Sequence, residues 1–124
     1  MSMSNQTSSI SESAQSNLES IEDEIEQSST YFKPKDGKVY LLSINPEEKI
    51  EAKLNEKFKD LQGRPTIRYE LKITHVNSGK AQLWETSKTL VSQIISELKK
   101  GYKVLEIRRF GSDRSTVYKV QGVQ

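Results

Sequence analysis

Few residues of this chain are of a type that carries out chemistry. Among its 124 residues there is one histidine, His75, and no cysteine, so neither a Cys/His pair nor a metal site with several histidines or thiolates can form. Serine and threonine are plentiful, but no nucleophile elbow, P-loop or dinucleotide-binding glycine pattern surrounds them. Glu47 and Glu48 lie on a predicted turn, which we interpret as a solvated pair. The sequence therefore predicts a binding protein with no enzymatic activity, metal or cofactor.

The charges of the chain are divided unevenly along its length. The six charged residues of positions 1–30 are all acidic, whereas all 19 lysines and arginines lie from Lys33 onward. Against the 11 acids of that part, these 19 cations give the body a formal net charge of +8. A field of this sign attracts polyanions, and nucleic acid is the commonest polyanion of a cytosol. A basic surface that serves solubility alone is the other interpretation.

Basic residues recur at three places in the body, which favours the binding of single-stranded nucleic acid. Such binding requires a basic groove for phosphates and exposed rings on which bases stack. In a small five-stranded barrel the three places converge on one side. The basic candidates are Arg68 and Lys72 on the second strand, Lys57, Lys59 and Arg64 at the first turn, and Arg108, Arg109 and Arg114 around the last turn.

Trp84 and Phe110 are the candidates for stacking on bases. Trp84 faces outward if Leu83 points into the barrel, because successive strand residues face opposite sides. In the inverted register Trp84 fills the core instead. Phe110 shares a strand face with Arg108 and either stacks on a base or closes the end of the barrel. Tyr118 falls in register with apolar neighbours, which favours core packing.

The first 34 residues are predicted to form a disordered acidic tail. Positions 1–30 are rich in Ser, Gln and Asn and hold too little apolar surface to offset the entropy of ordering. Leu18, Ile21 and Ile25, at spacings of three and four, indicate a transient helix or a docking motif for a protein partner. No apolar run reaches the length of a membrane span and no signal-peptide pattern is present, so we expect a cytoplasmic protein with no membrane partner.

Residues 35–124 carry the signals of a folded domain that is all-β with one helix. The strand signals cover 39–44 with 49–58, 66–76, 81–86, 103–110 and 115–121, and an amphipathic helix follows Ser87. The first strand is predicted to be long and kinked at Asn45-Pro46. The order β-β-β-α-β-β is that of the OB-fold, a five-stranded partly open barrel that binds oligonucleotides. A five-stranded roll with one helix is the nearest alternative.

Short motifs of the body resemble small OB-fold single-stranded DNA-binding proteins of phages and archaeal mobile elements. Leu83-Trp84 precedes the helix, a basic strand at 105–111 ends in glycine, and a Thr-x-Tyr-x-Val strand follows at 116–120. The resemblance covers roughly 38–120. It implies a protein that binds single strands with little sequence specificity, DNA in preference to RNA. Bacterial proteins of this function carry their acidic tail at the C-terminus, whereas the acidic segment here is N-terminal.

Two other functions remain open at the level of the sequence. One is an adaptor, in which the barrel or the tail docks a protein partner of replication or transcription. The other is a viral or plasmid regulator that reads duplex DNA. The response to a single strand separates them, because an adaptor does not bind oligonucleotides and a regulator prefers a duplex.

Overall fold

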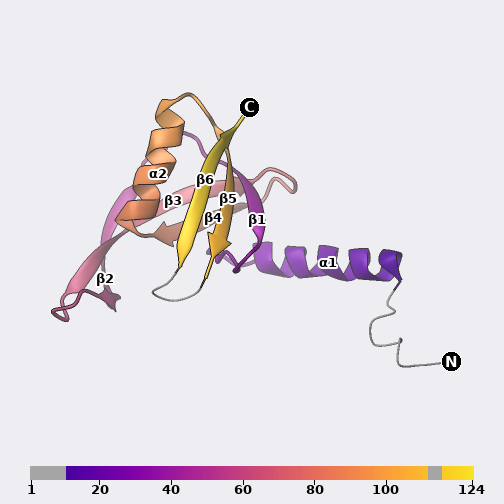
Figure 1. Cartoon of the computed structure of the whole chain (residues 1–124), viewed down its shortest axis with the longest axis horizontal. Helices are drawn as coiled ribbons and strands as arrows, with labels where there is room; N and C mark the ends of the chain where they lie inside the picture. The colour runs from indigo at the N-terminus through magenta and orange to yellow at the C-terminus, as the bar shows by residue number, and fades with distance from the viewer. Residues whose placement is uncertain (1–10, 112–115) are drawn as a thin grey trace.

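The computed structural model describes residues 11–111 and 116–124, which form two helices and one six-stranded sheet (Figure 1). The elements are α1 (Glu12–Gln27), β1 (Val39–Ser43), β2 (Glu51–Lys59), β3 (Pro65–His75), β4 (Ala81–Thr86), α2 (Lys88–Lys99), β5 (Val104–Phe110) and β6 (Val117–Val123). The antiparallel order is β2-β3-β1-β5-β6, with β4 paired to β3. Within these residues β4 and β6 do not pair, so the sheet stays open along one seam.

Local sequence signals explain most of these elements. Ser87 caps α2 by accepting a hydrogen bond from the backbone N–H of Leu90 at 3.3 Å. The β3–β4 and β5–β6 hairpins are antiparallel, as predicted. The predicted long first strand is divided into β1 and β2, because the Asn45 side chain accepts a hydrogen bond from the backbone N–H of Glu47 and forms a turn there.

β2 and the first half of β3 form an arm that projects beyond the rest of the sheet (Figure 1). Leu54 and Ile67 face each other across the arm and are 66% and 55% exposed. Farther out, Asn55 pairs with Thr66 and Lys59 with Pro65, so residues 56–58 have no partner on β3. These residues form a β-bulge, a feature that redirects side chains.

The core lies between the inner face of the sheet and α2. Its fully buried members are Leu42, Ile73, Leu90, Ile94, Leu105 and Ile107. Trp84 is 2% exposed and pairs with Leu71 on the same inner face, while Leu83 is half-buried. The expectation that Trp84 lies on the outer face is therefore wrong. The register is the inverted one, which removes the larger apolar ring from water.

An N-terminal segment completes this core. The backbone of residues 30–32 exchanges hydrogen bonds of 2.8 and 2.9 Å with Leu83 on the edge of β4. The Phe32 side chain is 3% exposed. Its ring makes three edge-to-face contacts at centroid distances of 4.8, 5.3 and 5.0 Å, with Tyr40, His75 and Trp84 respectively. The packed body thus includes residues N-terminal to the boundary expected at residue 35.

α1 is a second helix, in a region where the sequence predicts disorder and the predicted fold has only one helix. No residue of α1 is buried, so apolar packing does not explain it. Its last turn is held by polar contacts instead: Lys38 Nζ lies 2.6 Å from the Asp23 carboxylate and 2.9 Å from that of Glu26, and the Tyr40 hydroxyl donates to Glu26 at 2.6 Å. Composition does not reveal such contacts, because their partners lie elsewhere in the chain.

Phe32→Ala is expected to lower the free energy of unfolding by about 3–5 kcal/mol, because it removes a buried ring. Tyr31→Ala is the matched control: this neighbouring aromatic is 40% exposed, and its loss should cost less than about 1 kcal/mol. Urea denaturation followed by circular dichroism measures both values. A small and equal effect of the two substitutions would show that residues 30–32 do not belong to the core.

Candidate nucleic-acid interface

A groove of about 620 Å³ lies at the open seam, between the end of β4 and the start of β6. The first turns of α2, the β2 bulge, β3 and β5 also contribute to its walls. The helix N-terminus adds the positive end of its dipole to the groove. The residues whose charge or ring suits nucleic acid are Phe58, Arg68, Arg109 and Tyr118.

Phe58 lies at the mouth of the groove because of the bulge. In a regular strand it would share the face of Leu54, opposite Arg68. The bulge turns its ring toward Arg68 instead, whose Cζ lies 4.0 Å from the ring centroid. The Thr66 hydroxyl holds the bulge by donating a hydrogen bond to the Phe58 carbonyl at 2.6 Å. Phe58 stays 48% exposed, so its ring is open to a ligand.

Arg68 and Arg109 bring two positive charges to the groove. The Nε of each is buried and lacks a hydrogen-bond partner among the described residues. Burial lowers the pKa of Arg68, against the opposing effects of Glu85 and Tyr118. Arg109 donates from Nη1 to the Pro34 carbonyl at 2.6 Å. In residues 11–111 and 116–124 neither guanidinium forms a salt bridge, and Glu85 is the acidic residue that lines the same groove.

Tyr118 connects the core to the groove. Its ring packs against Trp84 at a centroid distance of 5.9 Å, as the sequence predicts, but it also lines the groove. Burial raises the pKa of Tyr118, while the charges of Arg109 and Arg68 lower it. The phenol therefore keeps its proton at neutral pH and can donate a hydrogen bond to an anion.

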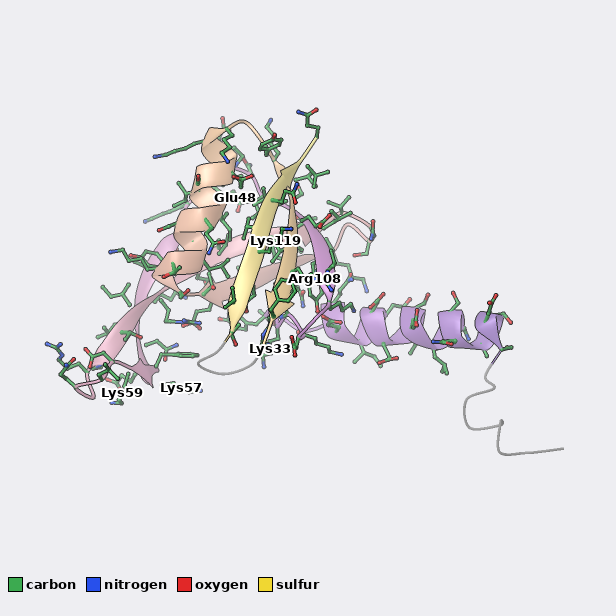
Figure 2. The ribbon with its side chains drawn as sticks, in the orientation of Figure 1. Lys33, Glu48, Lys57, Lys59, Arg108 and Lys119 are labelled. Carbon is green, nitrogen blue, oxygen red and sulfur yellow. The ribbon has the colours of Figure 1, made fainter. Side chains whose placement is uncertain are left out.

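Four other predicted residues lie on two different surfaces. Arg108 and Phe110 share the outer face of β5, as predicted, with Arg108 Cζ 5.0 Å from the ring centroid, and Phe110 is 42% exposed. Figure 2 shows Arg108 on β5 next to Lys119, its partner on β6. Lys57 and Lys59 are exposed at the far end of β2 (Figure 2).

Two further predicted basic residues, Arg64 and Lys72, do not line the groove. Arg64 lies at the tip of the arm and pairs with Asp60 at 3.0 Å. Lys72 is exposed on the outer face of β3, 3.8 Å from the Glu48 carboxylate. Arg114 lies outside the described residues. Among the predicted basic residues that the structure describes, the groove therefore brings together Arg68 and Arg109 only.

The sequence analysis assigns no binding role to two aromatic residues that line the groove, Phe58 and Tyr118. Strand alternation assigns Tyr118 to the core, and the bulge that redirects Phe58 has no sequence signature that we recognise.

The part of the chain that the structure describes has no cluster of three or more His, Cys, Asp or Glu residues suited to a metal ion, nor a helix that could span a membrane. Comparison of the chain with protein-family models, curated proteins and solved structures finds no match.

Arg68→Met is expected to leave the free energy of unfolding unchanged or to raise it by up to about 1 kcal/mol. Methionine keeps an apolar contact with Phe58 and removes a half-buried charge whose Nε has no hydrogen-bond partner among the described residues. Leu71→Ala on the same strand is the control, with an expected loss of about 2–5 kcal/mol. Urea denaturation compares the two. If Arg68→Met costs more than about 1 kcal/mol, Arg68 serves stability rather than a ligand.

Proposed function

We propose that this protein binds single-stranded nucleic acid, with little sequence specificity, at the groove along the open seam. The observation that carries the proposal is the pair Arg68 and Arg109, each with a buried and unpartnered Nε on one groove. Both arginines are half-buried, and a buried donor atom that makes no hydrogen bond is unfavourable for the folded protein alone. An anionic ligand removes that penalty, and the phosphate backbone is a ligand that supplies anions in series.

The chemistry of the groove suits both parts of a nucleotide. A phosphate accepts hydrogen bonds from the guanidinium groups of Arg68 and Arg109, which present planar arrays of donors, and from the Tyr118 hydroxyl. A base stacks on the exposed side of Phe58, whose other side rests on Arg68. Each stacked base contributes about 1–3 kcal/mol.

The geometry favours a single strand over a duplex. Stacking on Phe58 requires a base whose face is free, and bases inside a duplex present only their edges. Phe110, supported by Arg108 on the outer face of β5, offers a second ring to a strand that leaves the groove. The preference for DNA over RNA rests on the resemblance of the 105–111 and 116–120 strands to single-stranded DNA-binding proteins.

We infer that the sheet is an OB-like barrel opened between β4 and β6. The inference treats β1 and β2 as the two halves of one bent first strand, because both pair with β3. β3, β4, α2, β5 and β6 then follow in the order of that fold. OB-folds bind oligonucleotides on strands two and three and on the neighbouring loops. The corresponding strands here are β3 and β4, both of which line the groove.

Arg68→Met and Arg109→Met are each expected to weaken the binding of oligo-dT and of mixed-sequence single strands alike. Each should also reduce the slope of log K against log salt by about 0.7 for every phosphate group that the variant no longer neutralises. Fluorescence anisotropy at several salt concentrations measures both quantities. Lys99→Met, at the far end of α2 from the groove, is the control of equal charge. Arginine variants that behave like this control would remove the groove from the site.

Phe58→Ala is expected to weaken binding of a single strand by about 1–3 kcal/mol, because one base can no longer stack on the ring. Leu61→Ala removes a still more exposed apolar side chain, at the tip of the arm, and should change affinity by less than about 0.5 kcal/mol. The same titration with a duplex of matched sequence tests the strand preference. Tighter binding of the duplex would instead favour a duplex-reading regulator.

A further inference from the structure

α1 carries an apolar stripe that is not buried against the described chain. Leu18, Ile21 and Ile25 are 49%, 45% and 66% exposed. Their spacings of three and four place them on one face of the helix. The side chains that hold α1 to the body, Asp23 and Glu26, lie on a different face. The stripe therefore points away from the body.

The charge of α1 restricts what can cover this stripe. The helix contains six acidic residues and no basic one. Anionic lipid surfaces and nucleic acids repel it, and so does a second copy of the same helix laid alongside. The complementary partner is an apolar surface surrounded by cations.

The β2–β3 arm offers such a surface on this same chain. We call its exposed apolar residues Leu54, Leu61 and Ile67 the arm patch; they are 66%, 92% and 55% exposed. The arm, residues 51–68, carries five cations and three acids, which are Lys53, Lys57, Lys59, Arg64, Arg68, Glu51, Glu56 and Asp60. Its net charge is therefore +2, opposite in sign to α1.

The two surfaces lie at opposite ends of the molecule. Figure 1 shows α1 extending from one end and the arm from the other, and in Figure 2 Lys57 and Lys59 mark the arm end. The last turn of α1 is fixed by Lys38 and Tyr40 and by Gln82, whose Nε2 donates to the Glu26 carbonyl at 3.1 Å. α1 therefore cannot reach the arm of its own chain.

We propose that the α1 stripe of one copy docks on the arm patch of a second copy. The contact joins two different surfaces, so a row of copies always keeps a free α1 at one end and a free arm at the other, and the association is open-ended. Leu54 and Ile67 face away from Arg68, because Arg68 pairs with Lys53 on the other face of the arm. The docked helix thus leaves the Arg68 side of the groove uncovered, and the contact does not depend on the proposed function.

Sedimentation velocity of the full chain tests this contact. The average mass of the wild-type protein should rise with concentration, and salt should reduce the rise because it screens the opposite charges. Leu18→Gln, Ile21→Gln and Ile25→Gln together preserve helix propensity, and Leu54→Thr with Ile67→Thr preserves strand propensity. Each set should weaken self-association at least tenfold. Val76→Thr, at an apolar position that is 44% exposed elsewhere on the surface, should not.

Mixing the two defective proteins distinguishes this contact from any symmetric dimer. The helix variant retains an intact arm and the arm variant an intact helix, so the mixture should form a complex of one copy of each that does not grow further. Circular dichroism confirms that both variants are folded. A wild-type chain that stays monomeric at near-millimolar concentration, or an arm variant that associates like wild type, overturns the proposal. Oligo-dT titration of dilute protein reports on the groove separately, so failure of one proposal does not imply failure of the other.

Discussion

The Phe32 ring packs edge to face against Tyr40, His75 and Trp84, and these contacts link β1, β3 and β4 to a segment outside the named strands. The polar groups around the ring are satisfied as well. The His75 Nε2 and the Gln82 Oε1 lie 2.7 Å apart, and the Gln82 amide donates to carbonyls of residues 26 and 29. A buried polar network of this kind fixes one arrangement. The position of α1 therefore depends on the same core that supports the sheet.

The groove exists because this segment covers only part of the β4 edge. Residues 30–32 pair with β4 at Leu83, while Glu85 and Thr86, farther along the strand, line the groove. A strand that ran along the full edge would close the seam and leave no space for a ligand. Arg68 and Arg109 line that space, and among the described residues neither guanidinium forms a salt bridge.

Local signals predict much of this fold, and long-range packing decides the rest. Turn chemistry and alternation predict the hairpins and α2, because each signal lies within a few neighbouring residues. Alternation alone cannot choose between Leu83 and Trp84, since both are apolar, and the choice depends on Phe32 from outside the strand. In the candidate site, Arg68 and Arg109 were predictable from charge. Phe58 was not, because the bulge that turns it depends on pairing with β3.

The contacts that seal the N-terminal segment join residues far apart in the chain. Gln82 is separated from Tyr31 by 51 positions and Arg109 from Pro34 by 75. Closing loops of this length is entropically unfavourable until the strands that receive the segment have formed. Residues 31–34 leave the ribosome before the strands that receive them, and are thus among the last residues to reach their place in the fold. Until β6 has emerged, the Trp84 ring lacks its contact with Tyr118, and during this interval the nascent protein leaves that side of the ring uncovered.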